Sequence, residues 1–250
     1  MRMFRTMTML SLAVFILIPS LSAEALPVGT VDVVRTGHGA NYGISVYGAG
    51  LSGDIEYTGV YMLDKTGGTG SGDLWDNGAI PAFCIEVEEP APNLVTQYDV
   101  ISPADNYNGI LNETLGTAKA DYLSELWGRY YDPSWEGSGP FTPTQNMEAT
   151  AFAAAVWEIV YEDLPLSPLG WDVGSDGTPG IPGFAGLGVN TALANGWLAS
   201  LDGTGPMAEL AVFSNDGSQN FLVAVPEPMT LFLLGLGGAM SVMHRRRRIV

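Results

Sequence analysis

The side chain best suited to covalent chemistry is Cys84, the single cysteine of this 250-residue chain. A thiolate is a strong nucleophile, but Glu86, Glu88 and Glu89 follow closely, and nearby negative charge disfavours the thiolate. On an alternating strand, Cys84 would share a face with Glu86 and Glu88. One thiol cannot form an internal disulfide, so the fold is expected to depend on core packing. The simplest interpretation of Cys84 is therefore a small, packed and weakly reactive side chain.

Carboxylate pairs are a second chemical feature of the chain. Glu158 and Glu162 stand about one helical turn apart, and glycoside hydrolysis requires paired carboxylates, so a secreted glycan hydrolase is one alternative function. The chain has 27 acidic residues, however, so chance pairs are expected. His38 is the one histidine between the two ends and is expected in a glycine-flanked turn, which is too little for a catalytic triad or a zinc site. We expect no catalytic residues, no metal site and no cofactor.

These side chains must be positioned by a strand-rich domain. The chain has 32 glycines and 16 prolines, and short apolar or alternating runs separated by Gly, Asn and Asp are typical of strands. The predicted strands are Val28–Thr36, Tyr42–Tyr47, Tyr57–Leu63, Ile80–Val87, Val95–Ile101, Met207–Phe213 and Phe221–Val225.

Between the fifth and sixth of these strands, apolar residues recur at helical spacing. They predict a helical insert over about 113–202, with helices at Glu113–Tyr131, Thr144–Asp163 and Thr191–Leu201. The expected fold class is α+β. Residues 26–224 would form one antiparallel β-rich domain, sandwich or barrel-like, with an insert of two to three helices.

Cys84 and a helical tryptophan together resemble the frame of bacterial thioester domains. The segment Phe83-Cys84-Ile85-Glu86 is followed well downstream by the predicted helix that contains Trp157. In that family a cysteine sulfur and the side-chain carbonyl of a glutamine, four residues before the tryptophan, join into an internal thioester. Such a bond is an electrophile that captures amines on a target surface.

The glutamine position of this resemblance is not filled. Ala153 stands four residues before Trp157, and alanine has no acyl group. Gln145 lies about two helical turns before Ala153, or ~12 Å along the axis, and is a poor substitute. The resemblance therefore implies a thioester-domain-like fold without its covalent chemistry. A thioester-type covalent surface adhesin is the alternative from the same frame.

Residues 1–25 predict a signal peptide. Arg2 and Arg5 form a positively charged start, an apolar run follows, and Ala23 and Ala25 fit the small-residue rule for signal-peptide cleavage. We therefore expect export through the Sec translocon.

The C-terminal segment 225–250 has three features in a fixed order: a Pro-Glu-Pro tripeptide, an uncharged apolar stretch and an arginine cluster. The residues of the tripeptide and the cluster are Pro226, Glu227, Pro228, Arg245, Arg246, Arg247 and Arg248. Together the three features resemble the PEP-CTERM sorting signal of Gram-negative bacteria. The resemblance implies an exosortase as a partner, a transmembrane helix that anchors the protein in the inner membrane before processing, and arginines on the cytoplasmic side. The final location would be the cell surface or the extracellular matrix.

Charge excludes one class of partner. Only four basic residues lie between the two terminal signals, against 25 acidic residues. Such a negative field repels nucleic acid, so we expect no nucleic-acid partner. Since no catalytic set is apparent, the expected function is that of a non-enzymatic binding or structural protein of the cell surface or exopolysaccharide matrix. Exposed Trp and Tyr side chains are candidate stacking residues for the polysaccharide.

Overall fold

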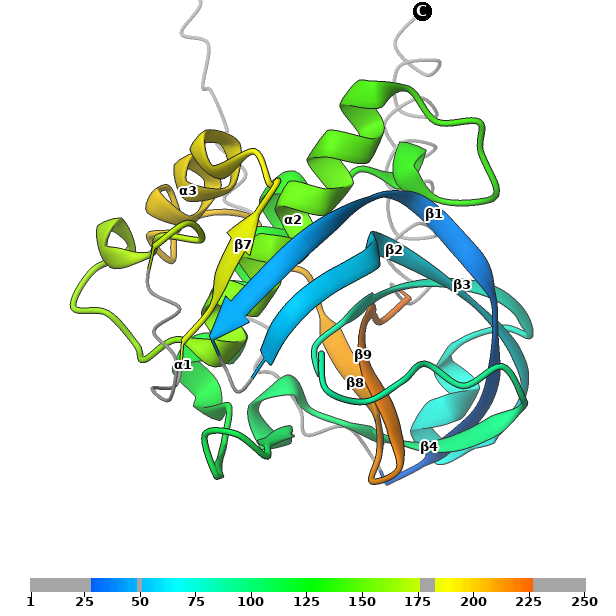
Figure 1. Cartoon of the computed structure of the whole chain (residues 1–250). Coiled ribbons are helices and arrows are strands. Elements are labelled where there is room, and N and C mark those ends of the chain that lie inside the picture. Colours follow the sequence, from blue (N-terminus) through cyan, green and yellow to red (C-terminus); the bar gives the residue numbers. More distant parts are fainter. Residues whose placement is uncertain (1–27, 49–50, 176–182, 227–250) are drawn as a thin grey trace, which may run out of the picture.

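The protein is a closed ring of antiparallel strands with its helices gathered on one side (Figure 1). A computed structural model describes residues 28–48, 51–175 and 183–226. The strands of the ring are β1 (Thr30–Gly48), β2 (Leu51–Thr69), β3 (Gly78–Cys84), β4 (Thr96–Ile101), β8 (Leu210–Asn215) and β9 (Ser218–Ala224). They pair in the order β1–β2–β3–β9–β8–β4, and β4 pairs back onto β1. The antiparallel β-rich domain is thus confirmed, in its barrel-like form.

β1 and β2 are long strands of 19 residues each and extend from the ring toward the helices (Figure 1). The sequence predicted two strands in place of β1, with His38 in a turn between them, and this was wrong. Register shifts between β1 and β2 on both sides of His38 mark bulges, which bend a strand without ending it. Gly39 is required there, because a Cβ at this position would lie 2.3 Å from the carbonyl oxygen of Trp135.

The helical insert lies between β4 and β8, as predicted. Its helices are α1 (Gly116–Tyr130), α2 (Pro143–Tyr161) and α3 (Thr191–Ala199). α1 begins later than expected, because Glu113–Thr114 form a short strand, β6, that pairs with Tyr107–Asn108, β5. The insert also contains β7 (Ala185–Leu187), which pairs with the far end of β1. β7 was not predicted, since three residues in a glycine-rich segment carry no alternating pattern.

α2 is the central element of the helical side. Every residue from Ala149 to Tyr161 is buried, including the polar Thr150 and the charged Glu158 among otherwise mostly apolar side chains. The Thr142 side chain and Gln145 form a capping box at its start. The Thr150 hydroxyl accepts a hydrogen bond from the Tyr42 backbone N–H and donates one to the Thr58 carbonyl oxygen, both at 2.8 Å. These bonds fix α2 against β1 and β2.

Aromatic side chains fill the space between the ring and the helices. Phe83 of β3 lies against Phe152 of α2, with ring centroids 4.7 Å apart, and against Trp127 of α1 at 5.5 Å. Trp135 packs on Phe152 from the loop between these helices, at 5.7 Å. Phe152 therefore joins the two layers of the fold.

Most of the two predicted sorting signals lies outside the described residues. This applies to the signal peptide with Ala23 and Ala25, and to Glu227, Pro228, the expected transmembrane helix and the arginine cluster. Pro226 is described and exposed. Within the described ranges, none of the helices combines the length and the apolar character needed to span a membrane.

Replacing Phe152 with alanine tests this packing. The side chain is fully buried among five aromatic rings, so Phe152→Ala should lower the free energy of unfolding by about 3–5 kcal/mol in urea denaturation. Leu166→Ala is the matched control, because Leu166 is fully exposed and should change stability by less than about 0.5 kcal/mol. Equal losses in the two variants would contradict the assigned core.

Candidate functional site

Cys84 at the end of β3 lies beside Gln219 at the start of β9. The two strands pair through Phe83 with Leu222 and Cys84 with Phe221. The Gln219 Nε2 atom donates a hydrogen bond to the Cys84 Sγ atom across 2.8 Å. Only 2% of the Cys84 surface is exposed, and 5% of Gln219. The structure therefore places a thiol in contact with an acyl-bearing side chain, away from water.

The distance between these two atoms is short for their size. A donor–acceptor distance of about 2.8 Å is ordinary when nitrogen donates to oxygen. Sulfur is the larger atom, so the same distance from the Gln219 nitrogen is a tight contact. The Gln219 Oε1 atom is buried and accepts no hydrogen bond within the described part of the chain. The Gln219 amide is thus held through its nitrogen atom, which is in tight contact with the Cys84 sulfur.

The pair faces the interior of the ring. Side chains alternate along a strand, so Cys84 points away from Phe83, which packs toward the helices. Phe221, opposite Cys84, lies with its ring 5.4 Å from that of Tyr61. Gln219, two residues before Phe221, shares its face. Tyr61 lies on β2, so β2 also contributes to the surroundings of the pair.

α2 reaches the same site through Trp157. The Trp157 indole N–H donates to the Cys84 carbonyl oxygen at 2.8 Å. Burial raises the pKa of Cys84 to about 12, and the nearby N–H groups of the Glu86 backbone and the Trp157 indole offset only part of this rise. Near neutral pH the thiol is therefore protonated, and a reaction at the sulfur requires a proton acceptor.

Two carboxylates follow Cys84 in different environments. Glu88 Oε2 accepts a hydrogen bond from the Tyr161 hydroxyl at 2.9 Å. Glu86 is half-buried, and its Oε2 atom is buried with no hydrogen-bond partner in the described ranges. Burial, followed by the charge of Glu88, raises the pKa of Glu86 to about 7. The expected alternation of Cys84, Glu86 and Glu88 on one strand face does not hold, because β3 ends at Cys84.

Cys84 and Trp157 lie together in the structure, as the resemblance implies. The acyl-bearing side chain next to Cys84, however, is on β9 and not on α2. Ala153 is buried in α2 and has none, and Gln145 caps the start of α2. Sequence analysis missed Gln219 because it considered only the helix. A signal was present: the chain has three glutamines, and Gln219 lies just before the apolar run of the last strand, the only one of the three there.

The carboxylates proposed for glycan hydrolysis have other roles. Glu158 is 0% exposed, and its Oε1 atom accepts the Asp172 backbone N–H at 2.7 Å. Glu162 Oε1 accepts the Phe184 backbone N–H at 2.6 Å. Both bonds hold the connection between α2 and β7. A sugar cannot reach Glu158 in this arrangement.

The remaining candidate, His38, packs against neighbouring side chains. His38 stacks on Tyr57 with ring centroids 4.2 Å apart, and its Nε2 atom lies 3.2 Å from Arg35 Nη1. In the part of the chain that the structure describes, no group of three or more His, Cys, Asp or Glu side chains could hold a metal ion. The expected stacking residues were exposed Trp and Tyr side chains; five of the six tryptophans are buried, whereas several tyrosines are exposed. The buried tryptophans are Trp75, Trp127, Trp135, Trp157 and Trp171, and the exposed tyrosines include Tyr42, Tyr47, Tyr57 and Tyr107.

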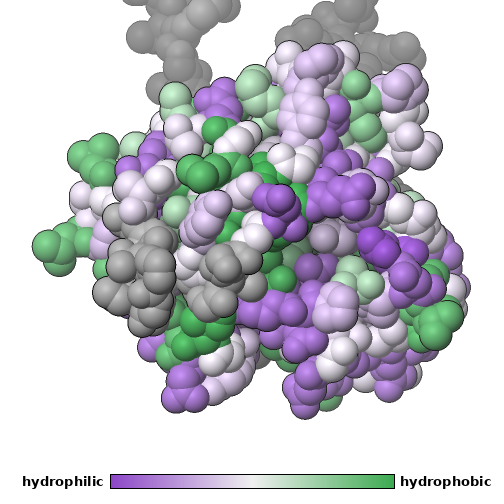
Figure 2. Space-filling model, in the orientation of Figure 1, coloured by the Kyte–Doolittle hydropathy of each residue, from purple (hydrophilic) through white to green (hydrophobic). Residues whose placement is uncertain are grey.

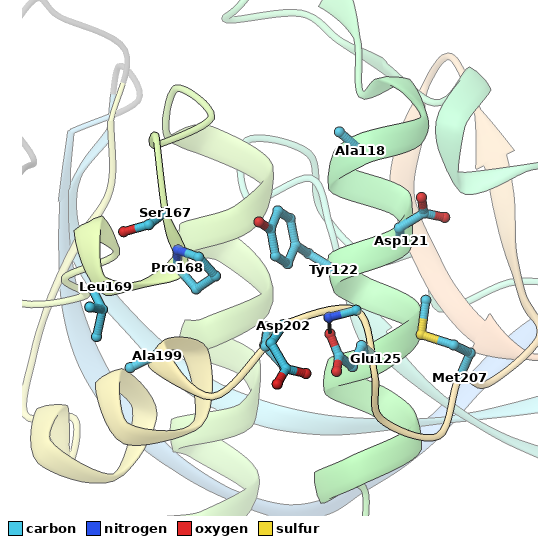
Figure 3. Close-up of a pocket in the computed structure, with 12 residues that line it drawn as sticks. Ala118, Asp121, Tyr122, Glu125, Ser167, Pro168, Leu169, Ala199, Asp202 and Met207 are labelled. Carbon is cyan, nitrogen blue, oxygen red and sulfur yellow. Dashed lines mark hydrogen bonds between the residues drawn. The ribbon is translucent and has the colours of Figure 1, made fainter.

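A separate cleft of about 600 Å³ lies between α1, the turn at Pro168–Gly170 and the loop after α3 (Figure 3). Glu125 on its floor accepts hydrogen bonds from the backbone N–H groups of Gly203 and Gly205 and from Arg129. Asp202 also binds Arg129, at 2.7 Å. These two carboxylates fix the loop.

Figure 2 shows a largely hydrophilic face with separate hydrophobic patches.

Comparisons with known proteins place the chain in no family. No protein-family model matches it, and neither does any curated protein or solved structure. The fold and site define the protein by themselves, as a closed antiparallel ring with a helical insert and a buried cysteine–glutamine pair. The particular feature of this site is the close approach of Gln219 to Cys84.

The pKa of Glu86 predicts how stability depends on pH. A carboxyl whose pKa is raised on folding holds its proton in the native state where the unfolded chain has lost it, so stability falls as pH rises from about 4.5 to above about 7. Glu86→Gln removes this titration. Its melting temperature should fall less than that of the wild type between about pH 5 and about pH 8.

The exposed Glu209 provides the control. Glu209→Gln should keep the wild-type dependence of melting temperature on pH. A Glu86→Gln profile parallel to that of the wild type would show that Glu86 does not titrate in this range.

Proposed function

We propose that this protein is an exported surface protein whose Cys84 and Gln219 join into an internal thioester that captures an amine. The observation that carries the proposal is the buried contact of 2.8 Å between the Gln219 Nε2 and Cys84 Sγ atoms.

The proposed bond forms without any other reactant. The Cys84 sulfur attacks the Gln219 Cδ atom, the bond from Cδ to Nε2 breaks, and ammonia leaves with the thiol proton. An incoming primary amine then attacks Cδ, and the bond from Cδ to Sγ breaks. The amine becomes joined to Gln219 as an amide, and Cys84 recovers its thiol. Each molecule reacts once, so the protein is a covalent binder and not an enzyme.

The surroundings of the pair suit a long-lived electrophile. Burial of Cys84 and Gln219 keeps water, the competing nucleophile, away from Cδ. Burial raises the pKa of Cys84, and the nearby N–H groups of the Glu86 backbone and Trp157 offset part of this rise, which favours the thiolate as the leaving group when the amine attacks.

Charge and the terminal segments support a role outside the cell. The acidic excess between the two ends draws cations toward the surface, and protonated amines are cations. The N-terminal signal peptide and the C-terminal segment that resembles PEP-CTERM signals fit export followed by exosortase processing. The target in this proposal is an amine-bearing molecule of another surface or of the surrounding matrix.

Intact mass tests the thioester. The wild-type protein should be lighter than its processed sequence by one ammonia molecule, and methylamine should add its own mass at Gln219. Cys84→Ser and Gln219→Ala should both have the full sequence mass and gain nothing. Gln145→Ala is the matched control and should keep the ammonia loss, because Gln145 only caps α2.

A wild-type protein of full sequence mass, with a Cys84 thiol that reacts with maleimide after denaturation, would overturn this function. Peptide mapping of the methylamine adduct to a residue other than Gln219 would overturn the assignment of the acyl group.

A further inference from the structure

We propose that the cleft between α1, the turn at Pro168–Gly170 and the loop after α3 binds an organic cation with an apolar body. The ligand in this proposal carries an ammonium group on a hydrocarbon or aromatic stem. The site is separate from the Cys84–Gln219 pair, and it does not depend on the proposed thioester.

The cleft has the size and the lining of a small-molecule site. Its volume of about 600 Å³ lies within the range of about 300–1,000 Å³ that is usual for ligand pockets. Such pockets combine apolar walls with a few polar groups. The apolar residues of this lining are Ala118, Pro168, Leu169, Ala199, Leu201 and Met207.

Two of these apolar side chains face water in the absence of a ligand. Leu169 in the turn is 79% exposed, and Met207 in the loop is 48% exposed. Figure 3 shows them on opposite sides of the cleft. An apolar stem placed between them would remove this surface from water, which favours binding.

Tyr122 adds an aromatic wall. It is half-buried, and Figure 3 shows it projecting from α1 into the space between α1 and the turn. Its ring packs edge to face on Trp171, with ring centroids 6.0 Å apart, so its position is fixed from behind. The face of an aromatic ring attracts an ammonium group. Tyr122 therefore suits both the apolar stem and the charge of the proposed ligand.

The charges around the cleft favour a cation. Asp121, Glu125 and Asp202 are among the described residues that line it, and none of these lining residues is basic. Arg129 is bound to Glu125 and to Asp202, so three carboxylates stand against one guanidinium. The net negative charge attracts a cation and repels an anion.

Two of the three carboxylates retain oxygen atoms for a ligand. Glu125 is occupied by the backbone N–H groups of Gly203 and Gly205 and by Arg129. Asp202 accepts its hydrogen bonds through Oδ1, which leaves Oδ2. Asp121 is exposed and forms no hydrogen bond or ion pair within the described ranges. A cation in the cleft therefore meets Asp121 and one oxygen of Asp202.

The cleft is formed before any ligand arrives. The bonds from Gly203 and Gly205 to Glu125, at 2.8 and 2.9 Å, hold the loop against α1. A Cβ at Gly205 would lie 2.1 Å from the Arg129 Nε atom, so the loop packs directly on the guanidinium. Binding therefore does not have to order this loop, which lowers its entropic cost.

The first test compares three probes that share one stem: (4-phenylbutyl)trimethylammonium, 4-phenylbutanol and 4-phenylbutyrate. Ligand-observed NMR titration of the full chain measures the Kd of each. The ammonium probe should bind about 5-fold or more tightly than the alcohol, and the anion should not bind. The ammonium probe has no N–H bond, so a thioester cannot acylate it, and the result is independent of the proposed function.

Variants locate the binding. Ala199→Trp fills the cleft and should abolish binding of the ammonium probe. Ala192→Trp is the matched control, because Ala192 is an exposed residue of α3 outside the lining, and it should bind like the wild type. Asp121→Asn should weaken binding about 2-fold to 5-fold. Asp73→Asn removes the same charge at an exposed position outside the lining and should have no effect.

Each part of the proposal has its own contrary result. Equal affinities in folded Ala199→Trp and Ala192→Trp, with melting temperatures as the check on folding, would overturn the location. Equal affinities for the ammonium probe and the alcohol would overturn the choice of a cation, and equal affinities in Asp121→Asn and Asp73→Asn would overturn the role of Asp121. A wild-type protein that binds none of the three probes would overturn the site as a whole.

Discussion

The pairing of β3 with β9 is the contact on which both the ring and the site depend. It comprises the residue pairs Phe83–Leu222 and Cys84–Phe221, extended by a hydrogen bond of 3.1 Å from the Ile85 N–H to the Asn220 carbonyl oxygen. The pairing closes the ring and also brings together two side chains that are 135 residues apart in sequence. A shift of one residue in this register would turn Gln219 to the opposite face, so the geometry of the site is a consequence of strand pairing.

The helical insert secures this pairing from outside the ring. It lies between Cys84 and Gln219 in the chain, and it returns to the end of β3 through Trp157. Tyr161, one turn further along α2, accepts the Val87 N–H at 2.9 Å and donates to Glu88. α2 therefore fixes the segment after Cys84, in which Glu86 lies. The residues around Cys84 therefore come from three elements, β3, β9 and α2.

Local sequence patterns were enough to predict the strands and helices, but not which strands pair to close the ring. Alternation and helical spacing identified the strands and the insert, since these signals extend over neighbouring residues. The partner of Cys84 could not be found in this way, because Gln219 reaches it through long-range pairing of β3 with β9. The resemblance placed the glutamine on the helix around Trp157. Because Ala153 stands at that position, the sequence predicted a site without a thioester. β1 shows the same limit: glycines beside His38 indicate a turn, whereas bulges carry the strand through.

The position of Gln219 has a mechanical consequence. In the proposed reaction, a target bonded to this side chain would be attached to the last strand of the ring, a few residues before Pro226. If the protein is held from its C-terminal side, as the sorting segment implies, tension on the target runs along β9 alone. It does not pass through β1 to β8 or through the helices. The ring would then carry little of the load, and the strength of the attachment would depend on how firmly β9 is held by its two neighbours.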